Sequence, residues 1–339
     1  MSKLLLIYAG GTIGMMRNAG GRLEPFDFDY LLDHIPELKL LPHQIKTLSV
    51  ENPIDSSDID FGIWSDLAQI IFDNYYDFEG FVILHGTDTM AYTASALSFM
   101  LENLSKPVVL TGSQLPIGDL RTDAKENIIT SLEIAGKKIN GKPAVPEVSV
   151  YFEYKLLRGN RTTKISSEHF NAFDSPNYPP LAEAGVEIYF NEELIRPHHK
   201  DIFKIFTGLS DAFVVLKIFP GMNETYFDIL ESGQIRGVIL ETYGSGNAPR
   251  FDWLQKKLKN ALDRGVKILS ITQCMHGKIH PERYETGRHL YELGIIPGSD
   301  MTLEAAVSKM AYLLGKNLTD KAMITAFKQS LRGELTEND

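Results

Sequence analysis

The chain has 339 residues, of which 43% are hydrophobic and 23% are charged. This composition is ordinary for a folded globular protein and excludes an intrinsically disordered chain. The length suits one large domain or two ordinary ones, and we expect two. The 34 basic and 44 acidic residues give a net charge of −10, which disfavours nucleic acid and anionic membranes as partners.

Cysteine content and the N-terminal sequence bear on the cellular compartment. Cys274 is the single cysteine, so an intrachain disulfide is excluded and a disulfide-stapled secreted scaffold is not indicated. The apolar run at residues 4–8 is followed at once by Gly10 and Gly11, which is too soon for the core of a signal peptide. No run approaches the roughly 20 apolar residues that a membrane-spanning helix needs. We therefore expect a soluble cytoplasmic protein.

Short apolar runs alternate with longer amphipathic segments through the first 190 residues. Strands are predicted at residues 4–8, 81–84, 108–110 and 148–152, and helices at residues 59–73, 90–101 and 124–137. Asp58 is expected to cap the first helix. This alternation predicts a mostly parallel sheet that is covered by helices on both faces.

Residues 191–211 break the alternation, because this charged, proline-containing stretch has no clear period. We expect a linker there, although part of it is also compatible with an edge strand, between domains at residues 1–190 and 212–339. Further strands are predicted at residues 213–219, 238–240 and 266–271, and further helices at residues 223–231, 251–263, 301–314 and 319–331. The predicted fold class is α/β, with two three-layer α/β/α domains: a larger N-terminal sheet domain and a smaller, flavodoxin-like C-terminal domain.

Polar clusters follow the predicted strands, which is where ligands of open parallel sheets bind. The first strand runs into G-G-T-I-G at residues 10–14, whose glycines let the backbone approach a ligand and leave N–H groups free for an anion. The strand at residues 81–84 ends in H-G-T-D-T at residues 85–89, which places Thr87 beside Asp88. Taken alone, the first cluster is weak evidence, because a tight strand-to-helix turn also explains it, and for the second a helix cap is the more frequent explanation.

Three further polar clusters appear at comparable places and weaken the helix-cap interpretation. They are D-S-S-D at residues 55–58, T-G-S-Q at residues 111–114 and R-G-N-R-T-T-K at residues 158–164. A hydroxyl nucleophile needs a base, because its own pKa lies far above neutrality, and a lysine can serve. Lys164 is the candidate base, although a solvated surface lysine is the usual alternative and spacing alone does not bring it to Thr87.

Motifs of other enzyme classes are absent or incomplete. The sequence lacks G-x-S-x-G, H-E-x-x-H and C-x-x-C. Residues 136–142 resemble a phosphate-binding loop, but Pro143 stands where Ser or Thr should bind magnesium. His276 and His280 are four residues apart, yet Pro281 follows directly and no third ligand is evident. We therefore predict no metal site.

Together and in this order, the motifs resemble those of the bacterial-type L-asparaginases, and most closely the cytoplasmic type I branch. The likeness continues through Y-G-S-G-N-A-P at residues 243–249 to L-R-G-E-L-T at residues 331–336, so it covers essentially the whole chain. It implies hydrolysis of L-asparagine to L-aspartate and ammonia without a cofactor, with a minor glutaminase activity. It also implies self-association as a homodimer or homotetramer.

The resemblance implies a role for each matching residue. Thr12 attacks the side-chain amide carbon and forms an acyl-enzyme, while a second group, made of Thr87, Asp88 and Lys164, activates the nucleophile or the water. The charged head of the substrate is held by the substrate-binding residues, which are Asp55, Ser56, Ser57, Thr87 and Asp88. Because the family builds its sites between subunits, the resemblance implies that Asn247 reaches the site of a neighbouring subunit.

The loop after the first motif departs from the family pattern. Many relatives carry a tyrosine there that touches the nucleophile, but residues 17–25 contain none. Either that helper is dispensable in this branch or another residue, such as Tyr30, replaces it. The adjacent glycines Gly20 and Gly21 keep the loop compatible with a mobile lid.

The second departure from the family pattern concerns an allosteric site. Some type I enzymes bind a regulatory asparagine through an arginine just before the Y-G-x-G-N run; here Glu241 and Thr242 occupy that region, while Thr163 and Cys274 match the other contacts. A carboxylate in place of the cation removes the partner of the effector's α-carboxylate and repels it. We therefore expect weak or absent activation by asparagine.

Two rival functions are compatible with parts of the sequence. One is the ammonia-supplying subunit of a tRNA amidotransferase, but that family has an N-terminal domain before the Gly-Gly-Thr motif, which begins here at residue 10. The other is a non-catalytic sensor of asparagine or aspartate that keeps the binding fold. The presence of every catalytic position, Lys164 included, favours the enzyme over the sensor.

Overall fold

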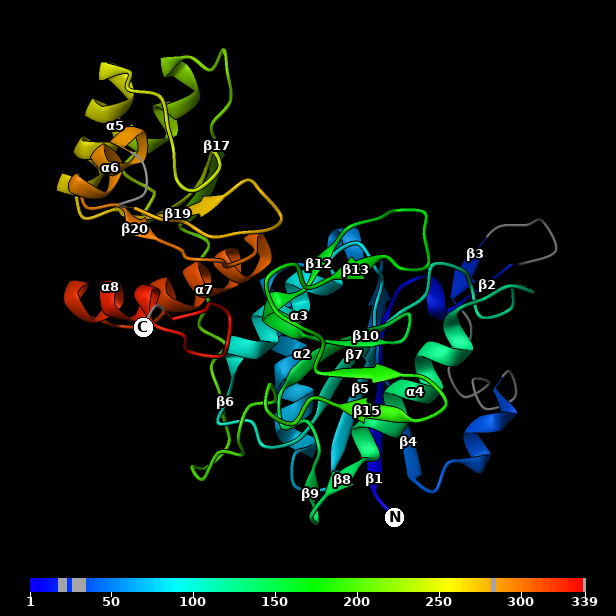
Figure 1. Ribbon diagram of the computed structural model, residues 1–339. Helices are drawn as coiled ribbons and strands as arrows, with labels where there is room; N and C mark the ends of the chain where they lie inside the picture. Colours follow the sequence, from blue (N-terminus) through cyan, green and yellow to red (C-terminus); the bar gives the residue numbers. More distant parts are fainter. Residues whose placement is uncertain (18–22, 26–34, 282–284, 338–339) are drawn as a thin grey trace. The chain divides into compact units, whose positions relative to one another are not determined.

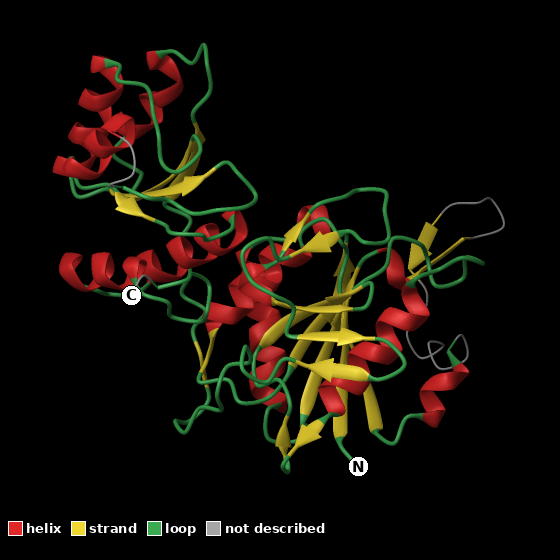
Figure 2. Cartoon of the chain, in the orientation of Figure 1, coloured by secondary structure: helices red, strands yellow, loops and turns green. Residues whose placement is uncertain are grey.

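The computed structural model describes residues 1–17, 23–25, 35–281 and 285–337. The chain divides into two compact units, Met1–Thr207 (unit 1) and Gly208–Asp339 (unit 2) (Figure 1). Each unit combines a sheet with helices (Figure 2), and the larger sheet is the N-terminal one. The predicted α/β class with a larger N-terminal and a smaller C-terminal domain is thus confirmed. No helix in the described part of the chain is long and apolar enough to cross a membrane.

An eight-stranded sheet forms the centre of unit 1, in the order β15-β14-β11-β10-β7-β5-β1-β4. Its strands are β1 (Lys3–Gly10), β4 (Gln44–Ile54), β5 (Gly80–Leu84), β7 (Val108–Thr111), β10 (Val148–Phe152), β11 (Lys155–Arg158), β14 (Ala182–Ala184) and β15 (Ile188–Phe190). The five neighbouring strands β10, β7, β5, β1 and β4 pair in parallel, as predicted. Antiparallel pairings add β11, β14 and β15 at the other side.

Helices cover both faces of this sheet. They are α2 (Phe61–Asn74), α3 (Met90–Met100) and α4 (Ala124–Gly136). Successive side chains of a strand point to opposite faces, and Leu4 and Leu6 of β1 pack in one buried cluster with Ile128 and Leu132 of α4. Figure 1 shows α2 and α3 on the opposite face. Unit 1 therefore has the expected three layers.

The start of α2 differs from its prediction. Asp60, rather than Asp58, caps the helix, because its Oδ1 accepts hydrogen bonds from the N–H groups of Gly62 and Ile63 at 2.9 and 3.1 Å. Asp58 ends a separate 3-10 helix, η4 (Ser56–Asp58), which Asp55 caps. The sequence offers three aspartates within residues 55–60, and the intervening 3-10 turn decides which of them begins the α-helix.

Short elements complete unit 1. They are η1 (Thr12–Gly14), β2 (Met15–Arg17), β3 (Leu23–Pro25), η3 (Pro36–Leu40), β6 (Leu101–Glu102), β8 (Lys138–Ile139), β9 (Lys142–Pro143), η5 (Gly159–Arg161), β12 (Thr163–Lys164), β13 (Phe173–Asp174) and β16 (Lys204–Ile205). Strand β16 lies within the stretch that we expect to be a linker and pairs with β6.

Unit 2 is built on a four-stranded parallel sheet in the order β17-β18-β19-β20. Its elements are β17 (Phe213–Lys217), η6 (Glu224–Glu231), β18 (Gly237–Thr242), α5 (Asp252–Asp263), β19 (Lys267–Thr272), α6 (Glu285–Glu292), β20 (Ile296–Pro297), α7 (Leu303–Gly315) and α8 (Asp320–Lys328). Leu240 and Ile268 of the sheet pack with Leu258 of α5 in a buried cluster. The helix predicted at residues 223–231 is a 3-10 helix, η6.

Candidate active site

Four parallel strands of unit 1 end at one edge of the sheet. Tyr8 of β1 lies beside Leu84 of β5, Leu84 lies beside Thr111 of β7, and Gly10 lies beside Ile54 of β4. The segments that follow these strands therefore meet at this edge, where α/β proteins bind their ligands. These segments carry Thr12, Asp55, Ser56, Ser57, Thr87, Asp88 and Gln114.

The turn that carries Thr12 lies directly against the turn that carries Thr87. Gly11 has a φ of +90°, and a Cβ added there would lie 2.3 Å from the backbone nitrogen of Gly86. A Cβ added to Gly86 would in turn lie 2.4 Å from Ser56 Oγ. Glycine at both positions therefore lets three polar segments approach one another closely.

Lys164 joins this edge through its side chain. Its Nζ donates a hydrogen bond to Thr87 Oγ1 at 2.8 Å and forms an ion pair with Asp88 Oδ1 at 2.7 Å. The side chain of Lys164 is 18% exposed, whereas that of Asp88 is 65% exposed. The amine is thus held between a hydroxyl and an open carboxylate, where it can exchange a proton with the hydroxyl. Thr87, Asp88 and Lys164 therefore form one cluster.

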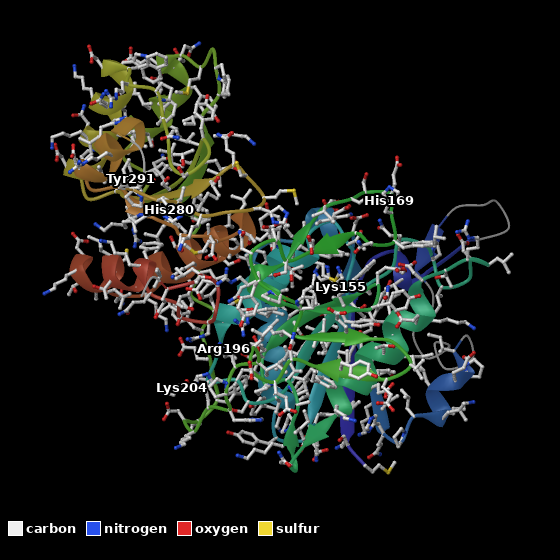
Figure 3. The ribbon with its side chains drawn as sticks, viewed as in Figure 1. Lys155, His169, Arg196, Lys204, His280 and Tyr291 are labelled. Atoms are coloured by element: carbon white, nitrogen blue, oxygen red, sulfur yellow. The ribbon has the colours of Figure 1, made fainter. Side chains whose placement is uncertain are left out.

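Gln114 also contacts this cluster, a role that the sequence motif alone did not indicate. Thr87 Oγ1 lies 3.4 Å from Gln114 Oε1, so the hydroxyl that accepts from Lys164 directs its own hydrogen towards the amide oxygen. Gln114 Nε2 donates to the carbonyl of His169, which lies in the loop between β12 and β13 (Figure 3). The backbone N–H of Gln114 donates to Asp123 Oδ2 at 2.9 Å. Its position three residues after the end of the buried strand β7 is the signal that could have marked it.

The segment after β4 supplies an exposed acceptor. Asp55 Oδ1 accepts hydrogen bonds from the backbone N–H and the hydroxyl of Ser57, both at 2.9 Å. These two bonds hold the pKa of Asp55 below its ordinary value. The adjacent Ser56 is buried, and its carbonyl accepts a hydrogen bond from Thr89 Oγ1 at 2.6 Å. This bond ties the Asp55–Ser57 segment to the Thr87–Asp88 turn.

The remaining predicted site residues are Thr12, the loop residues that follow it, and Asn247. Thr12 begins η1 and is half-buried. Tyr30 and residues 18–22, on which the loop predictions depend, lie outside the described residues. Asn247 lies in unit 2, where its backbone exchanges hydrogen bonds of 2.8 and 2.9 Å with that of Tyr243. Its contact with the site of a neighbouring subunit stays a prediction.

His85, which directly precedes the Thr87 turn, is buried and neutral. Its Nδ1 lies 2.7 Å from the carbonyl oxygen of Gly86, and because a carbonyl only accepts, Nδ1 carries the hydrogen. Nε2 then accepts from Thr93 Oγ1 at 2.9 Å, and Thr93 accepts from Trp64 Nε1 at 2.9 Å. Complete burial lowers the pKa of His85 from 6.5 to about 4.

This histidine should make the folded state sensitive to acid. Between pH 6.5 and about 4 the unfolded chain binds a proton at this position that the folded chain does not bind. The free energy of unfolding therefore falls as the pH drops through this window, by up to about 3 kcal/mol from His85. His85→Gln should reduce the slope of this free energy against pH by about one proton. Urea unfolding at several pH values measures both slopes, and equal slopes would contradict the assignment.

The fold and the site define a two-unit α/β protein whose site, at the carboxyl ends of parallel strands, combines threonine hydroxyls, a lysine and carboxylates. The model of the N-terminal asparaginase domain matches residues 3–196, and that of the glutaminase/asparaginase C-terminal domain matches residues 213–327. The chain belongs to the asparaginase family.

Individual relatives resemble the chain over its whole length. L-asparaginase 1 of Escherichia coli (strain K12) is 40% identical over 344 residues, which cover 99% of this chain and 98% of the relative. The crystal structure of L-asparaginase I from Vibrio cholerae is 39% identical, with a TM-score of 0.89 and 99% coverage of both chains. The structure of the L-asparaginase from Thermococcus kodakarensis is 32% identical, also with a TM-score of 0.89, and covers 99% of this chain and 100% of that one.

Proposed function

We propose that this protein is an L-asparaginase that hydrolyses L-asparagine to L-aspartate and ammonia through an acyl-enzyme on Thr12. The observation that carries the proposal is the contact of Lys164 Nζ with Thr87 Oγ1 and Asp88 Oδ1, 2.8 and 2.7 Å away, at the strand ends where the Thr12 turn also lies. The family membership supports the same activity.

The reaction divides into two steps. In the first, Thr12 Oγ attacks the side-chain amide carbon of asparagine, the carbon–nitrogen bond breaks, and the hydroxyl proton leaves with the nitrogen as part of ammonia. In the second, water attacks the aspartyl ester, the bond to Thr12 Oγ breaks, and a proton returns to Thr12. Thr87, Asp88 and Lys164 relay the proton for the nucleophile or the water. Backbone N–H groups of the two glycine-containing turns stabilise the oxyanion of each step.

The substrate's charged head fits the remaining groups. Asp55 is an exposed, ionised acceptor beside the hydroxyl of Ser57, and Asp88 presents a carboxylate that is 65% exposed. One α-ammonium group and one α-carboxylate group need at least one acceptor and several donors, and the buried Ser56 adds a further hydroxyl. We assign Asp88 to the ammonium group, the hydroxyls of Ser56 and Ser57 to the carboxylate, and Asp55 to the polar atoms beside that carboxylate.

The same resemblance extends the proposal to assembly and location. We assign the protein to the cytoplasm, as a homodimer or homotetramer in which Asn247 completes the site of a neighbouring subunit. We also assign it a minor activity on glutamine, whose side-chain amide is one methylene further from its charged head. Sedimentation of the purified protein and the activity of Asn247→Ala test the two structural parts of this assignment.

Turnover on asparagine tests the proposed function. Purified protein should release ammonia and aspartate from asparagine in an amount that exceeds the enzyme many times, and faster than it releases ammonia from glutamine. A protein that binds asparagine calorimetrically but releases no ammonia would be a sensor instead. That outcome would refute the enzyme assignment.

We expect no substantial activation by asparagine. Glu241 lies near the end of β18 in unit 2 and is half-buried, so an effector carboxylate at this position would meet a negative charge. The rate should follow a hyperbola in asparagine concentration. A sigmoidal curve that becomes hyperbolic when Glu241 is replaced would contradict this prediction. Glu241→Arg, which introduces a cation at this position, is the variant for which we expect a more sigmoidal rate curve.

A further inference from the structure

We propose that the buried ion pair between Glu147 and Arg158 is the positioning element that holds Lys164 against Thr87 during the reaction. The inference rests on the proposed function and adds two residues to its machinery. Neither residue touches the hydroxyls at the site; both act through the backbone that leads to Lys164.

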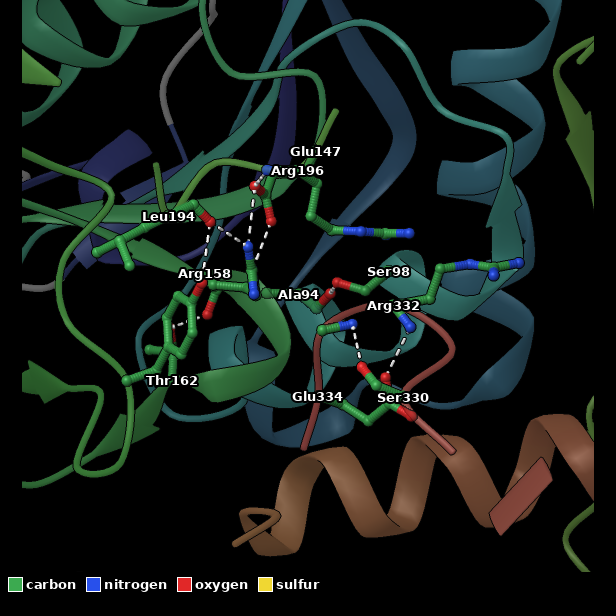
Figure 4. A network of polar contacts seen from close by, with 12 residues as sticks. Ala94, Ser98, Glu147, Arg158, Thr162, Leu194, Arg196, Ser330, Arg332 and Glu334 are labelled. Atoms are coloured by element: carbon green, nitrogen blue, oxygen red, sulfur yellow. Dashed lines mark hydrogen bonds and ion pairs between the residues drawn. The ribbon is translucent and has the colours of Figure 1, made fainter. Parts of the chain in front are cut away.

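Glu147 and Arg158 form a paired contact inside unit 1. Arg158 Nε donates to Glu147 Oε2 at 2.7 Å and Nη2 lies 3.3 Å from Oε1, while the two side chains are only 5% and 4% exposed. Nη2 also donates to the carbonyl of Leu194 at 2.7 Å (Figure 4). The guanidinium lies over the ring of Tyr178, 4.3 Å from its centroid. Burial opposes the charge of Arg158, but attraction to Glu147 and the hydrogen bonds to it outweigh burial and raise the pKa of Arg158, so the guanidinium keeps its charge.

A buried pair of this kind is better suited to fixing geometry than to adding stability. Replacing such a pair by apolar residues of similar volume is often neutral or stabilising, because desolvation offsets the attraction. Its parallel hydrogen bonds define the direction of the guanidinium as well as its distance. Glu147 Oε1 also accepts from the backbone N–H of Arg196 at 2.9 Å, so the carboxylate is itself fixed from a second segment.

The chain between Arg158 and Lys164 is held at each turn. Arg158 ends β11, and its carbonyl accepts a hydrogen bond from Thr162 Oγ1 at 2.7 Å, which closes the turn of η5. Strand β12 then pairs Lys164 with Phe173, and the N–H of Ile165 donates to Ala172 at 2.8 Å. A displacement of Arg158 would therefore be passed on to Lys164.

Thr87 and Asp88, the other members of the catalytic cluster, are also connected to η5. Helix α3 begins at Met90, directly after the Thr87–Asp88 turn, and packs on η5. A Cβ added to Gly159 would lie 3.2 Å from Ala94 of this helix and 3.0 Å from the carbonyl oxygen of Val148. The contact between α3 and η5 thus sets the separation of Thr87 from Lys164, and the Glu147–Arg158 pair holds the η5 side of it.

Glu147→Gln tests the proposal, because it keeps the shape of the side chain and removes its charge. We expect kcat on asparagine to fall about tenfold to a hundredfold, since a misplacement of about 1 Å can have an effect of that size. KM should stay within about twofold, because the pair does not touch the substrate's head. In a Lys164→Met background the same change should lower kcat no further, because the pair acts through Lys164. An additive loss in that background would overturn the proposal.

A second measurement does not depend on activity. The acetylation rate of Lys164, followed by peptide mass spectrometry with the exposed Lys259 as reference, should rise in Glu147→Gln as the amine leaves Thr87 and Asp88. An unchanged acetylation rate would overturn the positioning role, whether or not the wild-type protein releases ammonia. A failure of the wild-type protein to release ammonia would refute only the proposed function. If Glu147→Gln does not fold, Arg158→Lys, which keeps the charge but loses the paired contact, is measured in the same way.

The matched control is a buried ion pair of unit 2. Lys309 and Glu334 are 2.5 Å apart with both side chains 0% exposed, and the pair lies outside the chain segment that carries Lys164. Glu334→Gln should lower the unfolding temperature but leave the acetylation rate of Lys164 unchanged. If Glu147→Gln and Glu334→Gln reduced kcat in proportion to their losses of stability, the effect would be structural and the proposal would fail.

Discussion

Thr12→Ala should reduce ammonia release from asparagine by about 10³-fold or more, because the acyl-enzyme cannot form without the hydroxyl and only binding and oxyanion stabilisation remain. The residue is half-buried at the start of η1, so removing its hydroxyl and methyl groups should change the unfolding temperature by no more than a few degrees. Steady-state ammonia release and thermal unfolding measure the two effects separately.

Thr12→Ser is the matched control for this prediction. It keeps the hydroxyl and removes only the methyl group, so it should retain measurable turnover. Binding of aspartate to Thr12→Ala, measured by calorimetry, shows whether the site is still formed. Full activity of Thr12→Ala with a preserved fold would refute the nucleophile assignment and direct attention to Thr87.

Lys164→Met should lower kcat by about 10²- to 10⁴-fold, the usual contribution of a positioned acid or base. Methionine keeps most of the length of the side chain but cannot donate to Thr87 Oγ1 or pair with Asp88. KM should change less than kcat, because the lysine contacts the catalytic hydroxyl. A pH–rate profile of the wild-type protein and the variant measures the change across the range in which both fold.

Lys259→Met is the control for the loss of a lysine as such. Lys259 forms an ion pair with Asp263 on the surface of α5, with both side chains more than half exposed. Such pairs contribute little to stability, so this variant should keep its activity. Comparable kcat values for Lys164→Met and Lys259→Met would show that Lys164 is an ordinary surface lysine.

The sequence predicted the buried framework well, because apolar runs identify strands that are covered on both faces. The strands β1, β5, β7 and β10 are of this kind, with every or nearly every residue buried. The strands towards the two sides of the sheet have no such signal: β4, at one edge, alternates exposed and half-buried residues, and β14 and β15, at the other side, have only three residues each. The prediction of Asp58 as the cap was wrong because Asp58 and Asp60 are two residues apart and both could begin the helix; Asp60 is the one that does.

The two threonines of the site could also be predicted from the buried strands. Thr12 and Thr87 directly follow buried strands, so the rule for parallel sheets places both at the same edge. Lys164 lies 77 residues after Thr87, and no local pattern brings the two together; they meet in the structure, where η5, just before Lys164, packs on α3, just after Thr87. Gln114 likewise becomes visible as a partner of Thr87 only in three dimensions.

Hydrolysis in the presence of hydroxylamine tests the central claim most directly. An aspartyl ester on Thr12 can be attacked by hydroxylamine as well as by water, so ammonia release should continue while part of the aspartate is replaced by the β-hydroxamate of aspartate. Thr12→Ala should form neither product. Ammonia release with aspartate as the sole product at every hydroxylamine concentration would contradict an acyl-enzyme and indicate direct attack by water.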